Sequence, residues 1–71
     1  MKRIPVESSN LVSVAYDVDE KILEIEFHTG GIYQYKGVPK SVYEGLMSAE
    51  SKGKYFHKNI KNSGYPYTKV G

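Results

Sequence analysis

Cysteine is absent from this 71-residue sequence. Disulfide bonds and thiolate metal ligands are therefore excluded, and core packing alone must stabilise the fold. At this length we expect residues 1–71 to form a single domain with one small core. The lack of cysteine also fits the reducing cytosol, so we expect a cytoplasmic protein.

Long apolar runs are absent as well. No uncharged apolar stretch approaches the roughly 20 residues that a membrane-spanning helix needs. The basic N-terminal tip is interrupted by Pro5, Glu7 and Asn10 before an apolar run of signal-peptide length develops. We therefore expect neither a transmembrane segment nor an export signal.

Acidic residues are missing from the C-terminal part of the chain. Residues 51–71 contain five lysines and no acid, a net charge of +5, whereas residues 1–50 carry five basic groups and all eight acids, a net charge of −3. Such asymmetry bears on the choice of partner more than on the fold. It predicts contact between the C-terminal part and an anionic partner.

Alternating apolar residues predict three strands, near 11–17, 21–28 and 31–36. The glycines after His28 favour a tight reversal between the second and third strands. A loop with an odd number of residues puts Tyr33 and Tyr35 on the apolar face of the preceding strand, whereas a two-residue loop puts them on the opposite face. We favour the odd loop, because it gives one strongly apolar face.

Two helices are predicted, near 39–49 and 52–61. Pro39 suits the first helical turn, Ser51 can cap the second helix, and Gly64 can end it. The predicted fold class is α+β, with a three-stranded antiparallel β-meander packed against these C-terminal helices. The predicted core consists of Leu23, Ile25, Phe27, Val42, Leu46, Phe56 and Ile60. The closing "YPYTKV" should be extended and suits a sheet edge.

Several segments together resemble the KTSC domain family, which is named after the C-terminal extension of some lysyl-tRNA synthetases and also occurs as stand-alone bacterial proteins. The matching segments are "SSNLVSVAYD", "LEIEFHTGGIYQY", "VPKSVYEGLMSAES", "KGKYFHKNI" and "YPY". The resemblance implies a bacterial protein for which RNA binding is suggested by the link to a tRNA synthetase, and it supplies no catalytic residues. Ala15 departs from the family, which often has glycine before the strand-ending tyrosine.

Basic residues of the second helix and the tail are the main candidates for nucleic-acid binding. They are Lys52, Lys54, His57, Lys58, Lys61 and Lys69. On a helical wheel, four of them fall within an arc of about 100°, opposite Phe56 and Ile60. Such a stripe can neutralise phosphates and release counterions. The alternative is a solvated face that keeps the protein soluble.

Tyrosines interleave with these lysines. Tyr55, Tyr65 and Tyr67 are candidates for stacking on bases, or for anchoring the tail on the sheet, and Tyr55 borders the apolar face of its helix. Tyr33 and Tyr35, which belong to the family motif, are assigned a structural role because the favoured register buries their rings. Base stacking is the alternative for this pair.

No nucleophile motif, phosphate-binding loop or metal-ligand spacing occurs in the sequence. Lysines beside His57 would oppose a bound cation. We therefore predict no enzyme activity, no catalytic residue, no metal and no cofactor.

The predicted function is a small binding module for RNA or another single-stranded nucleic acid, acting through the basic, tyrosine-rich C-terminal helix and tail. One alternative is a protein-interaction module that uses a sheet edge or the tail to bind another protein or a second copy, and the oligomeric state is left open. A weaker alternative is adsorption to an anionic membrane surface through the same lysines.

Overall fold

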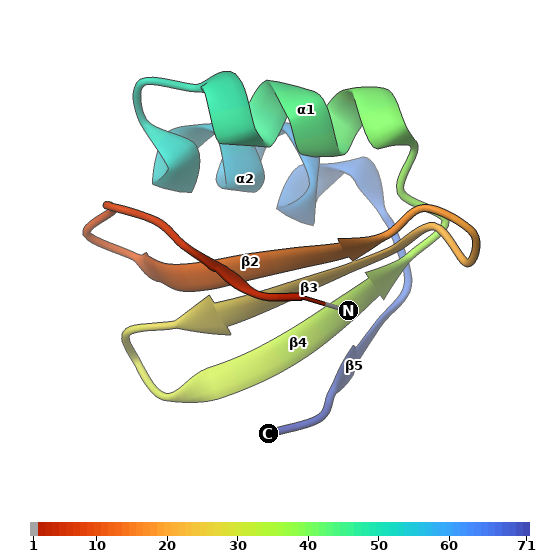
Figure 1. Cartoon of the computed structure of the whole chain (residues 1–71), viewed down its shortest axis with the longest axis horizontal. Coiled ribbons are helices and arrows are strands. Elements are labelled where there is room, and N and C mark those ends of the chain that lie inside the picture. Colours follow the sequence, from red (N-terminus) through yellow and green to blue (C-terminus); the bar gives the residue numbers. More distant parts are fainter. Residues whose placement is uncertain (1) are drawn as a thin grey trace.

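The computed structural model describes residues 2–71 and contains one five-stranded antiparallel sheet with helices on one of its faces (Figure 1). The elements in chain order are β1 (Ile4–Pro5), β2 (Leu11–Asp17), β3 (Ile22–Phe27), β4 (Gly31–Lys36), α1 (Lys40–Ser48), α2 (Lys52–Asn59), the 3-10 helix η1 (Lys61–Ser63) and β5 (Tyr67–Lys69). The strands follow one another across the sheet in this same order. This arrangement confirms the α+β class.

The prediction of three strands was wrong, because β1 and β5 extend the meander at its two edges. β1 has two residues, one of them Pro5, and β5 has three residues that follow Pro66. Strands this short show no alternation that a sequence pattern could detect. Their position agrees with the restriction of proline to sheet edges. The tail does run along an edge, as its sequence predicted.

The register between β3 and β4 is the one that places the paired tyrosines on the helix-facing side of the sheet. His28, Thr29 and Gly30 form a three-residue loop, in which Gly30 has a φ of 92°. As a result Tyr33 lies opposite Ile25 in the neighbouring strand, and Tyr35 lies opposite Leu23. The odd-loop prediction is confirmed.

The helices begin and end close to the predicted residues. α2 starts after Ser51, whose Oγ accepts a hydrogen bond of 3.4 Å from the backbone N–H of Lys54. The predicted helix over 52–61 is interrupted, since α2 ends at Asn59 and a 3-10 turn follows. Gly64 ends that turn in the left-handed region, with a φ of 80°.

The core lies between the sheet and the helices. Five of the predicted core residues are buried, namely Leu23, Ile25, Leu46, Phe56 and Ile60. Phe27 and Val42 are half-buried and pack against this cluster. Leu11, Val14, Ala15 and Val38 are also buried, although the predicted core did not include them. Tyr35 is buried, as the favoured register predicted.

On the outer face of the sheet, two carboxylates are paired with Arg3. Arg3 donates from Nε and Nη2 to Glu24 Oε2 over 2.8 and 2.7 Å, and its Nη1 lies 3.6 Å from Glu26. Gln34 donates to Glu24 Oε1 over 2.8 Å. The Gln34 hydrogen bond, followed by the Arg3 guanidinium, lowers the pKa of Glu24, although partial burial opposes the shift.

Candidate nucleic-acid interface

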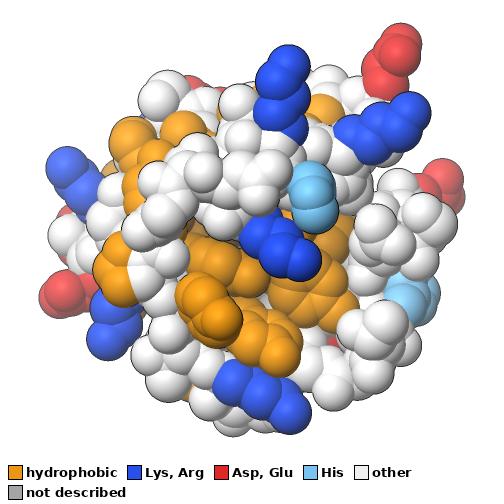
Figure 2. Space-filling view, turned by 180° about the vertical axis from the view of Figure 1, so that it is seen from behind, with side chains coloured by type: hydrophobic (Ala, Val, Ile, Leu, Met, Phe, Trp, Pro, Cys, Tyr) orange, Lys and Arg blue, Asp and Glu red, His pale blue; other side chains and the backbone are white. Residues whose placement is uncertain are grey.

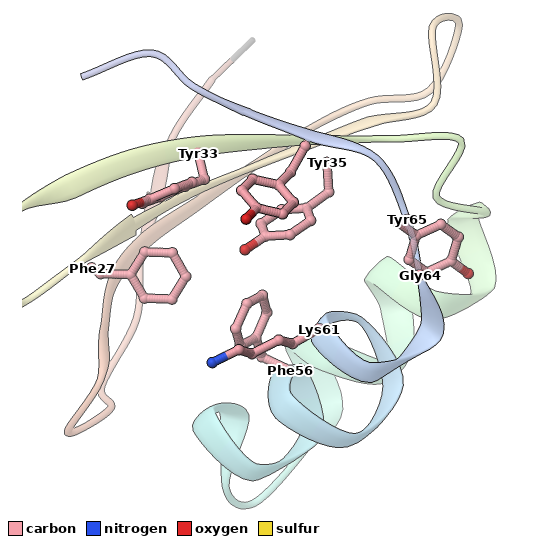
Figure 3. A pocket seen from close by; sticks show the side chains of 8 residues that line it. Phe27, Tyr33, Tyr35, Phe56, Lys61, Gly64 and Tyr65 are labelled. Atoms are coloured by element: carbon pink, nitrogen blue, oxygen red, sulfur yellow. The ribbon is translucent and has the colours of Figure 1, made fainter.

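An open pocket of about 540 Å³ lies where α2 and η1 meet the β4–β5 edge of the sheet (Figure 3). We call it the aromatic pocket. It is lined by Phe27, Tyr33, Tyr35, Phe56, Lys61, Gly64, Tyr65 and Tyr67. Its size falls within the range of roughly 300–1,000 Å³ that is usual for small-molecule sites.

Five rings of this pocket form a closed circuit of contacts. Phe27 contacts Tyr33 and Phe56 at centroid distances of 5.7 and 5.2 Å, both edge-to-face. Tyr35 contacts Phe56 at 5.4 Å and Tyr67 at 5.5 Å. Tyr33 and Tyr67 complete the circuit at 5.8 Å. Edge-to-face and tilted contacts stabilise such clusters by about 0.5–1.5 kcal/mol per pair beyond the buried area.

Burial differs strongly among the tyrosines of the circuit. Tyr35 is only 7% exposed and Tyr33 is half-buried, whereas Tyr67 is 62% exposed. Burial, reinforced by the neighbouring tyrosines, raises the pKa of Tyr35 to about 12, so its hydroxyl stays protonated at neutral pH. Tyr35 and Tyr33 therefore belong both to the packed structure and to the pocket wall.

A second pocket, of about 580 Å³, adjoins the first and shares Phe27, Phe56 and Lys61 with it. We call it the basic pocket. Besides the shared residues it is lined by Ser9, Asn10, His28, Thr29, Gly53, Lys54, His57 and Lys58. Figure 2 shows hydrophobic surface surrounded by lysine and histidine side chains on this side of the molecule, with acidic side chains only at the margins of the view.

The α-helical spacing and the 3-10 turn bring the cations to this pocket. Lys54, His57 and Lys58 project from α2, and Lys61 follows from η1. Gly53 lets the helix approach the start of β2, because a Cβ there would lie 2.7 Å from the side-chain nitrogen of Asn10. All ion pairs within residues 2–71 involve Arg3, so these lysines have no carboxylate partner.

Three of the predicted binding residues, Lys52, Tyr55 and Lys69, line neither pocket. Lys52 is half-buried and its Nζ donates to the carbonyl oxygen of Ala49 over 3.3 Å. Tyr55 is half-buried against α1, where a Cβ on Gly45 would clash with its ring. The side chains of Lys52 and Tyr55 are held by the junction between the two helices.

Among the predicted tail residues, Tyr65 and Tyr67 line the aromatic pocket, whereas Lys69 does not. Lys69 pairs with Tyr33 across the sheet, and Tyr67 pairs with Tyr35, so the two tail side chains share the helix-facing side. Tyr65 borders the pocket, but Figure 3 shows its hydroxyl directed away from the other rings. Tyr67 is thus the best placed of the predicted tail residues.

Several residues that line the two pockets were not predicted as binding residues. Phe27 was assigned to the core, and neither Asn10 nor His28 was singled out for binding. His28 Nε2 lies 3.1 Å from the Ser8 carbonyl oxygen and donates to it, which holds the imidazole at the pocket rim. No local motif marks these residues, because the loops that carry them meet α2 only in the folded chain.

Neither a metal cluster nor a membrane-spanning helix is found in the described part of the chain. Residues 2–71 contain no group of three or more histidine, aspartate or glutamate side chains arranged to hold a metal ion. None of the helices there is long and apolar enough to cross a bilayer.

Known proteins resemble this chain along nearly its whole length. A KTSC domain protein from Yersinia pestis has a crystal structure that matches with a TM-score of 0.94 and 44% identity, covering 99% of this chain and 97% of that one. An uncharacterized protein of Stutzerimonas stutzeri is 40% identical over 70 residues, 99% of either chain.

A longer protein shares part of the sequence. Over 55 residues the chain is 46% identical to a lysine–tRNA ligase of Nostoc sp., a match that covers 78% of this chain and only 10% of the ligase. The family model of the KTSC domain matches residues 7–65. By these matches and by its fold, the chain belongs to the KTSC domain family.

Proposed function

We propose that this chain is a non-enzymatic module that binds single-stranded nucleic acid, with RNA as its preferred partner in the cytoplasm. The observation that carries the proposal is the shared wall of the two pockets, in which Phe27, Phe56 and Lys61 separate an aromatic surface from a basic one. Proteins that bind single strands combine these two surfaces, since lysines attract the phosphates and rings stack on the bases.

The electrostatic part of the proposal rests on unpaired charge. Lys54, Lys58 and Lys61 are exposed around one pocket and have no acidic partner among the described residues. Lys69 adds a fourth cation beside the aromatic pocket. With three or four lysines engaged, the slope of log K against log salt should be roughly −2 to −3 for a single strand.

The preference for RNA is supported by the relatives of the chain. A segment about as long as this domain occurs within lysine–tRNA ligases, whose name gives tRNA as a substrate. A domain joined to such an enzyme is well placed to meet RNA. The non-enzymatic part is supported by the composition of the pocket walls, which present rings and ammonium groups suited to stacking and charge neutralisation.

The proposal is tested by titrating 15N-labelled protein with a short single-stranded RNA, and then with the matching DNA, at low and at high salt. We expect amide shifts around Lys54–Lys61 and Tyr67–Lys69, weaker at high salt and stronger with RNA. Lys58→Gln should weaken binding, whereas Lys36→Gln, which removes an exposed lysine outside both pockets, should not. A spectrum that RNA leaves unchanged at millimolar concentration would refute the proposal.

A protein partner is the second candidate, favoured by one observation. β5 is an edge strand with three exposed residues, and Tyr67 and Val70 are large hydrophobic side chains that are 62% and 50% exposed. Edge strands pair with strands of other chains, and tyrosine is enriched at interfaces. Binding that does not weaken with salt, or a mass that grows with protein concentration, would favour this candidate over RNA.

A further inference from the structure

We infer that the aromatic pocket receives one unstacked nucleobase, while a phosphate of the same nucleotide lies in the basic pocket against Lys54, Lys58 and Lys61. This inference rests on the proposed function and assigns a separate task to each pocket.

None of the aromatic rings in the circuit around the aromatic pocket is stacked in parallel on another ring of the circuit. Elsewhere in the protein, Tyr16 and Tyr43 stack on each other with centroids 4.8 Å apart and an angle of 8° between their planes. None of the five contacts of the aromatic circuit is parallel, since their angles range from 37° to 77°. A flat ligand can therefore stack on a ring of the pocket without displacing an existing stack.

Tyr67 is the ring best placed for this contact. It is the most exposed member of the circuit, at 62%, and it stands on an edge strand opposite the buried Tyr35. Its backbone is held by pairing with β4, so its ring is positioned before the ligand arrives. A ring that is both exposed and positioned loses little conformational entropy on binding.

Lys61 decides which kind of flat ligand fits. Its side chain borders both pockets, and Figure 3 shows it passing beside the Phe56 ring. Aromatic sites that bind cations depend on attraction between the cation and the rings, and a neighbouring ammonium group would repel such a ligand. The combination selects a flat, uncharged aromatic group linked to an anionic group, and a nucleotide has this chemistry.

The rim of the basic pocket adds hydrogen-bond donors and acceptors next to the cations. Ser9, Asn10 and Thr29 line it, and all three are exposed. Side chains of this kind contact phosphate and sugar oxygens in nucleic-acid complexes. Both pockets are open to solvent, so a strand can enter one pocket and continue beyond the other.

The test uses a short strand of propanediol phosphate spacers that carries one central adenosine, and the same strand without the adenosine. The two probes have the same phosphates, so the ratio of their dissociation constants measures the base alone. We expect the strand with adenosine to bind about 5- to 150-fold more tightly, the range for one base stacked on an aromatic residue. AMP is the third probe, which distinguishes a free nucleotide from a strand.

Variants separate the two pockets. Tyr67→Leu should bring the ratio of the two dissociation constants close to 1 while leaving the affinity for the base-free strand unchanged. Tyr67→Phe should leave the ratio as it is in the native protein. Lys58→Gln should weaken both strands by the same factor. Tyr43→Leu is the matched control, because it removes a tyrosine already stacked elsewhere, and it should keep the ratio.

Each outcome has a defined meaning. Equal affinity for the two strands would overturn the base site while leaving the proposed function standing, whereas failure of both strands and of natural RNA to bind would overturn the proposed function itself. A ratio that survives Tyr67→Leu would place the base elsewhere and also overturn the inference. AMP that binds as tightly as the adenosine strand, with the same loss in Tyr67→Leu, would support the site with a free nucleotide as its ligand.

Discussion

On the outer face of the sheet, Glu24 and Glu26 are neutralised within the protein by Arg3, whereas on the helix face Lys54, Lys58 and Lys61 have no acidic partner in residues 2–71. The sheet thus separates a cluster of paired charges from a cluster of cations without acidic partners. Charges already paired offer little to a ligand, and unpaired cations beside an aromatic surface attract an anionic one. The difference locates binding on the helix face.

The tyrosines of two regions also differ, because one pair is fully engaged in contacts within the protein and the tyrosines of the aromatic pocket are not. Tyr16 and Tyr43 stack face to face, and the Tyr16 hydroxyl donates to the carbonyl oxygen of Val38, so this pair is satisfied internally. Around the aromatic pocket, the contacts of Tyr67 are tilted and most of its surface is exposed. Both charge and aromatic surface are therefore left available in one place.

The largest effect is expected when the wall between the two pockets is removed. Phe56 is 7% exposed and contacts Phe27 and Tyr35. Phe56→Ala should lower the free energy of unfolding by about 3–5 kcal/mol, because the cavity adds to the lost burial. Denaturant unfolding measures it. Val18→Ala, at a position that is 56% exposed, should stay within about 0.5 kcal/mol of the native protein. Similar losses for both variants would contradict this assignment of the core.

Removing the unpaired cations should have the next largest effect, on affinity rather than stability. Replacing Lys54, Lys58 and Lys61 together by glutamine should weaken RNA binding roughly 100-fold at about 0.1 M salt, and reduce the salt slope by about 2. Fluorescence anisotropy at several salt concentrations measures both quantities. Lys36→Gln, outside both pockets, is the matched control and should change neither. An unaltered slope in the triple variant would show that the helix face is not used.

Alkaline titration should report on the helix face through Tyr35. Its pKa is raised to about 12 from an ordinary value of 10.0, so the unfolded chain releases this proton first. The corresponding stability is complete below pH 10 and is lost as the pH rises toward 12. Unfolding measured from pH 9 to 12 should therefore show a decline that is smaller in Tyr35→Phe. If stability declines identically with pH in the native protein and in Tyr35→Phe, burial of the Tyr35 hydroxyl would be contradicted.

Acid titration should report on the outer face, with a smaller effect. The pKa of Glu24 is lowered from its ordinary value of 4.5, so this carboxylate stabilises the fold above that pH and loses its contribution as the pH falls toward the folded-state pKa. Glu24→Gln should cost about 1 kcal/mol at pH 7 and less at pH 3. Urea unfolding of both proteins at pH 7 and pH 3 measures this loss of stability. A loss that is larger at pH 3 than at pH 7 would contradict a lowered pKa for Glu24.

Local signals in the sequence were sufficient for the central elements. Alternating apolar residues identified the three inner strands, Ser51 marked the start of α2, and the loop ending in Gly30 led to the correct tyrosine register. They were insufficient for the edges, because a two-residue strand and a three-residue strand contain too few positions to show a period.

The candidate site was only partly predictable for a related reason. Charge asymmetry directed attention to the C-terminal lysines, but Lys52 and Tyr55 share that segment and are occupied by contacts with Ala49 and α1. The amino-acid composition gives the number of lysines and tyrosines in the segment, but not the direction in which each side chain points. The direction of each side chain depends on the helix it stands on and on what the helix packs against.

The sequence by itself determined the fold class, the helix-facing position of Tyr33 and Tyr35, and the excess of positive charge after residue 50, because each depends on periodicity, on loop length or on composition. Only the tertiary structure decided that Phe27, from β3, and Phe56, from α2, form one wall with Lys61. Residues 27 and 56 meet through long-range packing of the helix on the sheet, and no local pattern in the chain encodes that contact.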